Sequence, residues 1–582
     1  MTVRTSVAEP ASQVVEADDF AETLPDREIR QSEAVRRFPI ALVLLSTVFI
    51  AYSAFFIFKT SFVFRGVRYF TLFDDMMIGM RYASNLVHHG ELVWNPGERV
   101  EGFTNPLWIF YFALLHLLPV SMAKISLLVQ ITGVALMLAT GWIVYKLAVL
   151  LSDGSHYAGL AATALTLFYY PLTNWALQGC EVSLLAFLLT LAVWQFLKAS
   201  QTGSFTVWPY LLMGFAVLTR IDAAVPLVAL LSYALITDRK RARRHLTLGL
   251  GILVLALGSQ TVARRLYYGD IVPNTYYQKI SGTPFLLRLE RGWVSFARFI
   301  LQVNPILILL AGSTLFTRKR VQIALPLSIV MFQLAYSTAV GGDAWEKFGG
   351  TNRYLSIAIP LFFAVLGCAL RSLTDFITGV PGHWRASWSP FWKVAAVACA
   401  VVTLNVGGDT ENAKQWALAE LPPDVELLQQ HAKAGLLIPA FTQPDAKIAV
   451  VWAGVLPYFA ERPAIDLLGK CDKVIAREPI KSVPGQVFRP GHMKWDYEYS
   501  ISHFHPDMIV ELWRAPEQAA DILRREHYRE MYLTGLKIYV RTDSDKIDWR
   551  ALEKAMADPT SAIRVNRTAA ELQPQIGPTR TS

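Results

Sequence analysis

The sequence predicts a mainly α-helical, multi-pass membrane protein with an α/β domain at its C-terminal end. The 582-residue chain is 53% hydrophobic, has a mean hydropathy of +0.33 and contains only 17% charged residues, whereas roughly a quarter of residues are charged in soluble domains. Apolar runs of about 20 residues, long enough to cross a bilayer as helices, recur as far as residue 406. Beyond that point the apolar runs shorten to the length of strands.

The distribution of basic residues orients the predicted spans. Arg36-Arg37, Arg239–Arg244 and Arg318–Arg320 all lie in the cytoplasm if the N-terminus does and about eleven segments cross. The net charge of +9 is therefore interpreted as positive cytoplasmic loops, not as a surface for nucleic acid. Phe103–Pro119 would invert this topology as a full span, so it is interpreted as a partial or re-entrant helix. The predicted spans lie near 38–62, 124–148, 157–172, 181–198, 206–219, 223–237, 246–263, 297–316, 321–339, 354–370 and 390–406.

This topology divides the chain into four regions. They are a disordered cytoplasmic tail (1–37), a transmembrane domain (38–406), an extracytoplasmic α/β domain (407–556) and a polar, disordered tail (557–582). In the α/β region, Ile448–Trp452, Met508–Val510 and Leu536–Val540 predict buried strands, and Glu517–Arg525 predicts a helix that follows a proline.

An acidic pair, Asp74-Asp75, opens a predicted helix in the first loop on the outer side. Its apolar residues share one face, which suits a helix lying in the membrane interface. They are Met76, Met80, Ala83 and Val87. The two carboxylates are interpreted in two ways: they favour the positive end of the helix, or one of them is a general base that takes a proton from an acceptor hydroxyl.

Other charged groups gather in the loops on the same predicted side. Arg220 and Asp222 occupy a turn at membrane depth, where charge is usually either paired or functional. Arg353 is a candidate for holding a phosphate bidentately, or alternatively an interfacial anchor. Lys279 is a candidate for a lipid phosphate, and Arg264 departs from the positive-inside rule, which a bound anionic headgroup would explain. The remaining candidates for substrate binding are Glu101, Glu181, Tyr268, Asn274 and Asp343.

Several chemistries lack support in the sequence. No Walker loop or Rossmann fingerprint occurs, so nucleotide-sugar chemistry on the cytoplasmic side is not indicated. No metal site is predicted and no cofactor is firmly implied, while a requirement for a divalent cation stays open.

In this order, the acidic and basic stretches resemble the GT-C superfamily of membrane glycosyltransferases. The resemblance is strongest to the terminal β-arabinofuranosyltransferase of actinobacterial cell-wall arabinan and its uncharacterised relatives. Two stretches depart from the family pattern, because Gln178 replaces the usual Ser and Arg220-Ile221-Asp222 replaces Arg-Pro-Glu. The matching stretches are Asp74-Asp75, Asn95–Gly102, Gly179-Cys180-Glu181, Arg220-Ile221-Asp222, Tyr267–Lys279 and Gly341-Gly342-Asp343.

The resemblance implies an inverting transfer of a sugar, with arabinofuranose as one candidate, from a polyprenyl-phosphate donor to a glycan or lipoglycan acceptor. The reaction would take place at the outer face of the bacterial cytoplasmic membrane, with Asp74 as the base and Asp75 beside it. The implied partners are the donor lipid, the acceptor and membrane lipid, with no nucleic acid. The alternative is a transporter or flippase for lipid-linked glycans, but transporters tend to carry ionisable groups near mid-membrane, whereas here the charges gather at one face.

Overall fold

The computed structural model of the chain describes residues 24–346, 351–378, 389–407, 410–482 and 487–557. The chain divides into two compact units, Met1–Thr47 and Val48–Ser582, so most of the helices and the C-terminal sheet belong to one unit. Of the two predicted disordered tails, residues 1–23 and 558–582 lie outside the described residues. Helix α1 (Leu24–Thr60) begins at Leu24, within the region 1–37 that was predicted as a tail.

Among the described residues, six helices are long and apolar enough to cross a membrane, and the number rises to eight if each of two bent helix pairs is one span. The six are Ile40–Thr60 within α1, α4 (Met122–Leu151), α7 (Val182–Gln201), Arg239–Tyr268, which contains α10 (Ala242–Tyr268), α14 (Arg320–Val340) and Ile359–Ile377 within α16 (Ile359–Thr378). The bent pairs join α12 (Phe285–Val303) to α13 (Pro305–Ser313) at 78°, and α18 (Ser389–Val406) to α19 (Thr410–Trp416) at 115°.

Fewer helices reach spanning length than the eleven predicted, because apolar composition does not reveal where a helix ends. Helices α5 (His156–Leu167) and α8 (Trp208–Thr219) have 12 residues each and α9 (Ala224–Thr237) has 14, which is about 18–21 Å against a hydrocarbon core of about 30 Å. Helix α3 (Pro106–His116), in the segment interpreted as a partial helix, has 11 residues. Helix α6 (Tyr170–Leu177) is shorter still.

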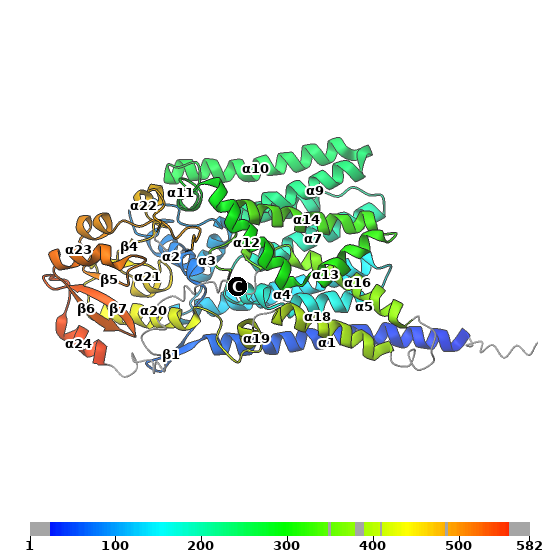
Figure 1. The fold of residues 1–582 in the computed structure, drawn as a ribbon, viewed down its shortest axis with the longest axis horizontal. Coiled ribbons are helices and arrows are strands. Elements are labelled where there is room, and N and C mark those ends of the chain that lie inside the picture. Colours follow the sequence, from blue (N-terminus) through cyan, green and yellow to red (C-terminus); the bar gives the residue numbers. More distant parts are fainter. Residues whose placement is uncertain (1–23, 347–350, 379–388, 408–409, 483–486, 558–582) are drawn as a thin grey trace, which may run out of the picture. The chain divides into compact units, whose positions relative to one another are not determined.

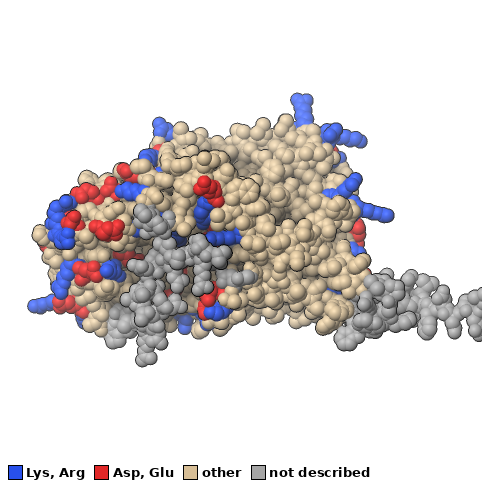
Figure 2. All heavy atoms as spheres, in the orientation of Figure 1, with Lys and Arg blue, Asp and Glu red and all other residues tan. Residues whose placement is uncertain are grey.

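The charged side chains are distributed as expected for a multi-pass membrane protein. On the face shown in Figure 2, they gather over the C-terminal domain and at the far ends of the helices, and they leave an almost uncharged band between the two. Large exposed apolar side chains such as Leu255, Leu266 and Leu309 lie on these helices. Such an apolar surface is stable against the lipid tails of a bilayer, whereas its exposure to water is unfavourable.

Helix α2 (Asp74–His89) follows a short hairpin of β1 (Phe62–Phe64) and β2 (Val67–Tyr69). The helix begins where predicted, but it does not lie half-exposed in the membrane interface. Most of its first ten residues are buried, including Arg81, because α3 covers one side and the C-terminal domain another. At Gly79 a Cβ atom would lie only 2.5 Å from the Ile109 side chain of α3, so glycine permits this close approach.

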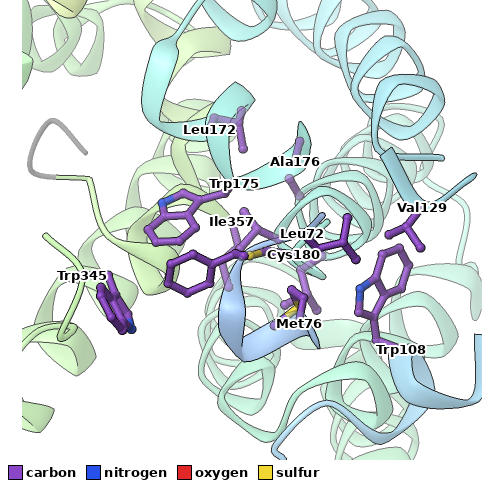
Figure 3. Close-up of a cluster of buried hydrophobic side chains, with 14 of the residues drawn as sticks. Leu72, Met76, Trp108, Val129, Leu172, Trp175, Ala176, Cys180, Trp345 and Ile357 are labelled. Carbon is purple, nitrogen blue, oxygen red and sulfur yellow. The ribbon is translucent and has the colours of Figure 1, made fainter. Parts of the chain in front are cut away.

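A buried core surrounds the start of α2. Figure 3 shows the segment of Leu72 and Met76 between Trp175 and Trp345 on one side and Trp108 on the other. The Trp108 indole donates to the carbonyl of Gly179 at 2.9 Å. Because this core joins segments distant in sequence, it fixes the first turn of α2 relative to the helices.

The C-terminal domain is built on a five-stranded sheet in the order β4-β3-β5-β7-β6. Strands β3 (Ile448–Val450), β4 (Ala464–Asp466) and β5 (Met508–Val510) are parallel, and β7 (Leu536–Arg541) and β6 (Tyr528–Leu533) are antiparallel to their neighbours. The three predicted strands are confirmed, while β4 and β6 were not predicted. The predicted helix at 517–525 is a 3-10 turn (Pro516–Ala519) followed by α23 (Ala520–Arg525). Four more α-helices of this domain, labelled in Figure 1, are α20 (Val425–Leu437), α21 (Val455–Ala460), α22 (Lys473–Arg477) and α24 (Trp549–Ala557).

The carboxyl ends of the three parallel strands lie at the same edge of this sheet. The loops after them carry Trp452 and Gly454 (after β3), Lys470 (after β4) and Trp513 (after β5). In open α/β sheets this is the edge at which ligands bind. Here it faces helix α2 and the segment around α11 (Asn274–Lys279), as the contacts described below establish.

Candidate active site

Asp75 lies at the centre of a cluster of charged side chains from four separate parts of the chain. Its carboxylate accepts from Arg353 Nη1 at 2.9 Å and from Lys470 Nζ at 2.6 Å. Arg353 in turn forms a bidentate pair with Asp343, at 2.7 and 3.0 Å. The Asp75 side chain keeps 17% of its surface exposed, so this carboxylate is open to a small molecule.

The surrounding cations determine the ionisation of Asp75. Burial opposes the charged form, but Lys470, Arg353 and Lys279 outweigh it and lower the pKa of Asp75 well below its usual range. Arg353 likewise lowers the pKa of Asp343 against the effect of burial. Both carboxylates are therefore ionised at neutral pH.

A helix cap on its backbone and two aromatic rings beside its side chain fix the position of Arg353. It opens the short helix α15 (Arg353–Ser356), which the side chain of Asn352 caps by accepting from the amides of Tyr354 and Leu355. Its guanidinium carbon lies 5.7 Å from the Phe73 ring and 5.5 Å from the Trp175 ring, an arrangement that favours a cation.

The turn that carries Asp343 is fixed by Glu346, which the sequence did not single out. Glu346 accepts from the backbone amide of Asp343 at 2.9 Å and from Arg291 of α12 at 2.7 Å. Ser295, one turn further along α12, donates to the same carboxylate at 2.5 Å. These contacts make α12 part of the support of the site.

Lys470 reaches Asp75 because its loop is held rigidly. The carboxylate of Asp466, at the end of β4, accepts from the amides of Leu468 and Cys471 at 2.9 and 2.7 Å. Asn274 donates to the carbonyls of Gly469 and Lys470, each at 3.0 Å. Asn274, predicted to bind substrate, thus positions Lys470.

Asp74 points away from Asp75 and into the C-terminal domain. Its Oδ1 atom accepts from the amides of Gly454 and Val455, at 3.2 and 2.9 Å, where α21 begins. Its side chain is buried, with 1% of the residue exposed. A Cβ atom on Gly454 would lie 2.0 Å from the carbonyl oxygen of Asp74, so this contact requires glycine. The geometry gives Asp74 a structural role and Asp75 the accessible position.

Asp74 is expected to make the protein less stable as pH rises, in contrast to a paired carboxylate. Burial, aided by Asp75 and opposed by Lys470 and the Val455 amide, raises its pKa to about 6 from 3.8. The folded state therefore binds this proton more tightly than the unfolded state, and the resulting stability is present below pH 4 and lost as pH rises through 6.

Asp74→Asn should remove that loss, because asparagine keeps an oxygen for the two amides. We expect the variant to exceed the unmodified protein in thermal stability at pH 8, by up to about 3 kcal/mol, and to match it at pH 4. Melting curves of the purified protein across this range test the expectation. A variant that is less stable at every pH would show that the charge itself is needed.

Further polar contacts lock α2 to the C-terminal domain. Arg81 donates to Asn95 Oδ1 and to the carbonyls of Trp94, Pro457 and Arg462. The Asn95 side chain bonds both the amide and the carbonyl of Ala464, at 3.1 and 2.8 Å. The stretch around Asn95 therefore belongs to a domain interface.

Arg220 is fully engaged by carboxylates. It pairs with Asp222 at 2.5 Å and with Glu181 at 2.8 Å, and its Nη2 atom reaches the carbonyl of Arg353 at 3.4 Å. The sequence left open whether Arg220 and Asp222 are paired or functional, and in the structure they form an ion pair. The Arg220 guanidinium is buried and contacts the backbone of Arg353.

Arg264 is engaged in the same way. It forms a bidentate pair with Glu101, and the Glu101 carbonyl accepts from the amide of Asn274 at 3.0 Å. Tyr268 donates to the carbonyl of Leu92 at 2.7 Å. Arg264, Glu101 and Tyr268 therefore support the segment around α11 that carries Asn274 and Lys279.

Lys279 differs from these paired cations. Within the described part of the chain, no carboxylate or carbonyl oxygen is paired with its ammonium group, and its side chain packs along Gly491. Burial and Arg353 lower its pKa, while Asp343 and Asp75 oppose the shift. Lys279 lies with Arg353 and Lys470 beside Asp75, and of these three cations it is the one whose ammonium group has no carboxylate partner among the described residues.

The sequence did not reveal the part played by the C-terminal domain. Two residues of this domain near the site, Lys470 and the half-buried Arg489, were not predicted, and neither was Glu346 in the turn after Asp343. Nothing in the local sequence distinguishes the three from surface residues. Among the residues that the structure describes, no group of three His, Cys, Asp or Glu side chains is arranged to hold a metal ion.

The fold is GT-C-like, the fold class predicted from the sequence. Two crystal structures of ArnT from Cupriavidus metallidurans are similar to this chain, each with a TM-score of 0.53. The one bound to undecaprenyl phosphate is 13% identical to this chain in sequence, and the one in the apo state is 14% identical. They cover 86% and 87% of this chain and 98% of their own. The Archaeoglobus fulgidus oligosaccharyltransferase complex with Zn and sulfate has a TM-score of 0.50 at 13% identity, covering 86% of this chain and 73% of that one.

At these identities the likeness concerns the fold, and it confirms the predicted GT-C-like class with a C-terminal domain that contains a sheet. A family model described as "Domain of unknown function (DUF8728)" matches residues 422–556, which include all five strands of that sheet. A search of curated protein sequences finds no match.

Proposed function

We propose that the protein is an inverting glycosyltransferase that uses a polyprenyl-phosphate sugar as donor and reacts at the Asp75 cluster. The observation that carries the proposal is an accessible carboxylate, Asp75, bound by Arg353 and Lys470 beside the unpaired Lys279. A glycosyl transfer needs these two elements together, a carboxylate for the acceptor proton and cations for the phosphate that leaves.

Lys279 and Arg353 are the proposed ligands of the donor phosphate. The unpaired ammonium group of Lys279, beside the guanidinium of Arg353, suits a phosphodiester, and it suits the more negative lipid phosphate that is released even better. Such a site stabilises the leaving group more than the ground state, which is the condition for catalysis. Arg353 is itself paired with carboxylates, but one of them is Asp75. Arg220 and Arg264 are paired with carboxylates other than Asp75 and are not proposed for this role.

In the proposed reaction the acceptor hydroxyl oxygen attacks the anomeric carbon of the sugar. The bond from that carbon to the phosphate oxygen breaks, and its electron pair leaves with the lipid phosphate. The proton of the hydroxyl passes to Asp75, and the configuration at the anomeric carbon inverts. This assigns the base to Asp75, whereas the family resemblance places it at Asp74.

A low pKa makes Asp75 a weak base at rest, but donor binding would change it. A phosphate that takes contacts from Arg353 and Lys279 brings its own negative charge close to Asp75 and reduces the influence of the cations. Both effects raise the pKa of Asp75. The base is thus activated when the donor is in place, which limits unproductive proton transfer.

The site is proposed to lie on the extracytoplasmic face of a bacterial cytoplasmic membrane, with the polar C-terminal domain, residues 407–556, on the same side. The finer assignment rests on the sequence resemblance, which makes arabinofuranose a candidate sugar and a cell-wall glycan or lipoglycan a candidate acceptor. The sheet edge at Lys470 completes the site from the C-terminal domain.

The test is to incubate the purified full-length protein with a panel of polyprenyl-phosphate sugars and an acceptor extract, and to measure the polyprenyl phosphate released. We expect release with at least one donor and transfer of its sugar with inverted configuration. Movement of an intact lipid-linked sugar across vesicles without release would identify a transporter instead.

Lys279→Gln should weaken donor binding more than it slows the chemical step. A charge-assisted contact to a phosphate contributes about 1.5–3 kcal/mol, so KM for the donor should rise roughly 10-fold to 100-fold. Initial rates over a range of donor concentrations measure this effect. Lys473→Gln, on neighbouring α22 and paired with Asp270, is the matched control and should leave KM unchanged. An unaltered KM in Lys279→Gln would exclude Lys279 as a phosphate ligand.

A further inference from the structure

A second group of side chains lies next to the Asp75 cluster and has no role in the proton transfer or the phosphate binding proposed above. It consists of Trp452, Trp513, Arg489 and Arg514, all from the C-terminal domain, and we call it the tryptophan–arginine cluster. The guanidinium carbons of Arg489 and Arg514 lie 5.9 and 5.8 Å from the Trp513 ring. All four side chains are half-buried.

Neither arginine forms an ion pair within the described part of the chain, although Asp424, Asp343 and Asp75 act on Arg489 at longer range. Arg514 donates to Met493 Sδ and to the carbonyl of Val487, and Arg489 donates to the carbonyl of Ala344, but no described carboxylate lies within 4.0 Å of either. Burial, aided by Arg489, lowers the pKa of Arg514 to about 10. A half-buried guanidinium such as that of Arg514, with no carboxylate nearby among the described residues, is costly, and an anionic ligand would remove that cost.

The cluster is connected directly to the reactive centre. Arg489 Nε donates at 3.2 Å to the carbonyl of Ala344, the residue after Asp343. Its guanidinium carbon also lies 4.2 Å from the ring of Trp345, which packs on Trp452 at 5.7 Å and on Phe73, the residue before Asp74, at 5.1 Å. A molecule bound at the cluster would therefore lie close to Asp75.

The position in the sheet supports a ligand site. Trp452 follows β3, and Trp513 and Arg514 follow β5, so both groups stand at the carboxyl edge where open α/β sheets bind ligands. Tryptophan faces stack on the C–H faces of sugar rings, and arginine recognises carboxylate or phosphate bidentately. The combination suits a sugar that carries an anionic group.

We propose that the tryptophan–arginine cluster binds a glycan bearing a carboxylate or phosphate group, and that this glycan is the acceptor. The second half of the proposal rests on the proposed function, whereas the binding does not. Lys279 belongs to the segment between α10 and α12, so the donor phosphate stays beside the membrane helices. The acceptor enters from the side of the C-terminal domain.

Binding is measured with the purified full-length protein and no donor, by quenching of tryptophan fluorescence and by calorimetry. One pair of probes is a uronate-containing oligosaccharide and its carboxyl-reduced form. The other is a phosphorylated oligosaccharide and its dephosphorylated form. We expect the anionic member of at least one pair to bind at least 10-fold more tightly than its neutral counterpart, and the pair that shows the difference identifies the anion.

Arg489→Gln and Arg514→Gln should each reduce that preference at least 10-fold, and Arg514→Lys should retain part of it. Arg524→Gln is the matched control, since Arg524 is an exposed arginine of the same domain paired with Asp521, and it should leave binding unchanged. Equal binding of neutral and anionic forms, no binding of either pair, or an unaltered preference in folded Arg489 and Arg514 variants would overturn the proposal. Selective binding without any release of polyprenyl phosphate would instead leave a glycan-binding site and refute the proposed function.

Discussion

Asp75→Asn is expected to reduce the release of polyprenyl phosphate by about 10³-fold, while Asp74→Asn retains most of the activity. A positioned general base contributes roughly 10²-fold to 10⁴-fold, and only Asp75 combines exposure with contacts to Arg353 and Lys470. Asp74 is buried against the start of α21. Initial rates of both variants at saturating donor measure the difference.

Asp74→Asn also serves as the control for this experiment, because the two residues are adjacent and the substitution is the same. Circular dichroism and melting curves of both variants establish that they are folded. An inactive Asp74→Asn together with an active Asp75→Asn would return the base to Asp74, as the family resemblance implies. It would also require α21 to move away before the reaction.

Lys470→Met is expected to lower the rate at least about 100-fold, even though Lys470 belongs to the C-terminal domain. Removing one partner of a buried ion pair costs about 3–5 kcal/mol, and here the loss falls on the orientation and charge of Asp75. The pKa of Asp75 should rise because Lys470 is the first of the cations that lower it. The acid limb of the pH–rate profile should therefore move to higher pH.

Lys470→Arg, which keeps the charge, should recover part of the rate and should leave the acid limb near its original position. A purely structural role for Lys470 would lower the melting temperature without moving the acid limb. Full activity of a folded Lys470→Met variant would show that the C-terminal domain does not contribute to the reaction.

Much of the helical framework could be predicted from composition and periodicity alone. The long apolar helices, α2 with its acidic first turn and three strands of the sheet follow from local patterns. The lengths of the helices could not, because α5, α8 and α9 are as apolar as a membrane helix but end after 12 to 14 residues. Hydropathy shows which residues avoid water, but it does not show where a helix ends.

The proximity of Asp75, Asp343 and Arg353 could be predicted, because all three lie in or next to loops assigned to the outer side of the membrane. Which aspartate is accessible could not be predicted. Successive residues of a helix point about 100° apart, so Asp74 and Asp75 face different neighbours, and the docked domain decides which one is buried. Lys470 lies 395 positions from Asp75 and reaches it only because Asp466 and Asn274 hold its loop. No local pattern encodes such a contact.

The central claim is that a lipid phosphate binds beside Asp75, and a structure of the protein with polyprenyl phosphate tests it most directly. We predict density for the phosphate within about 3 Å of Lys279 Nζ and a guanidinium nitrogen of Arg353, with the prenyl chain leading toward the membrane helices. Density for the phosphate at another part of the molecule, with Lys279 and Arg353 unchanged, would contradict the account.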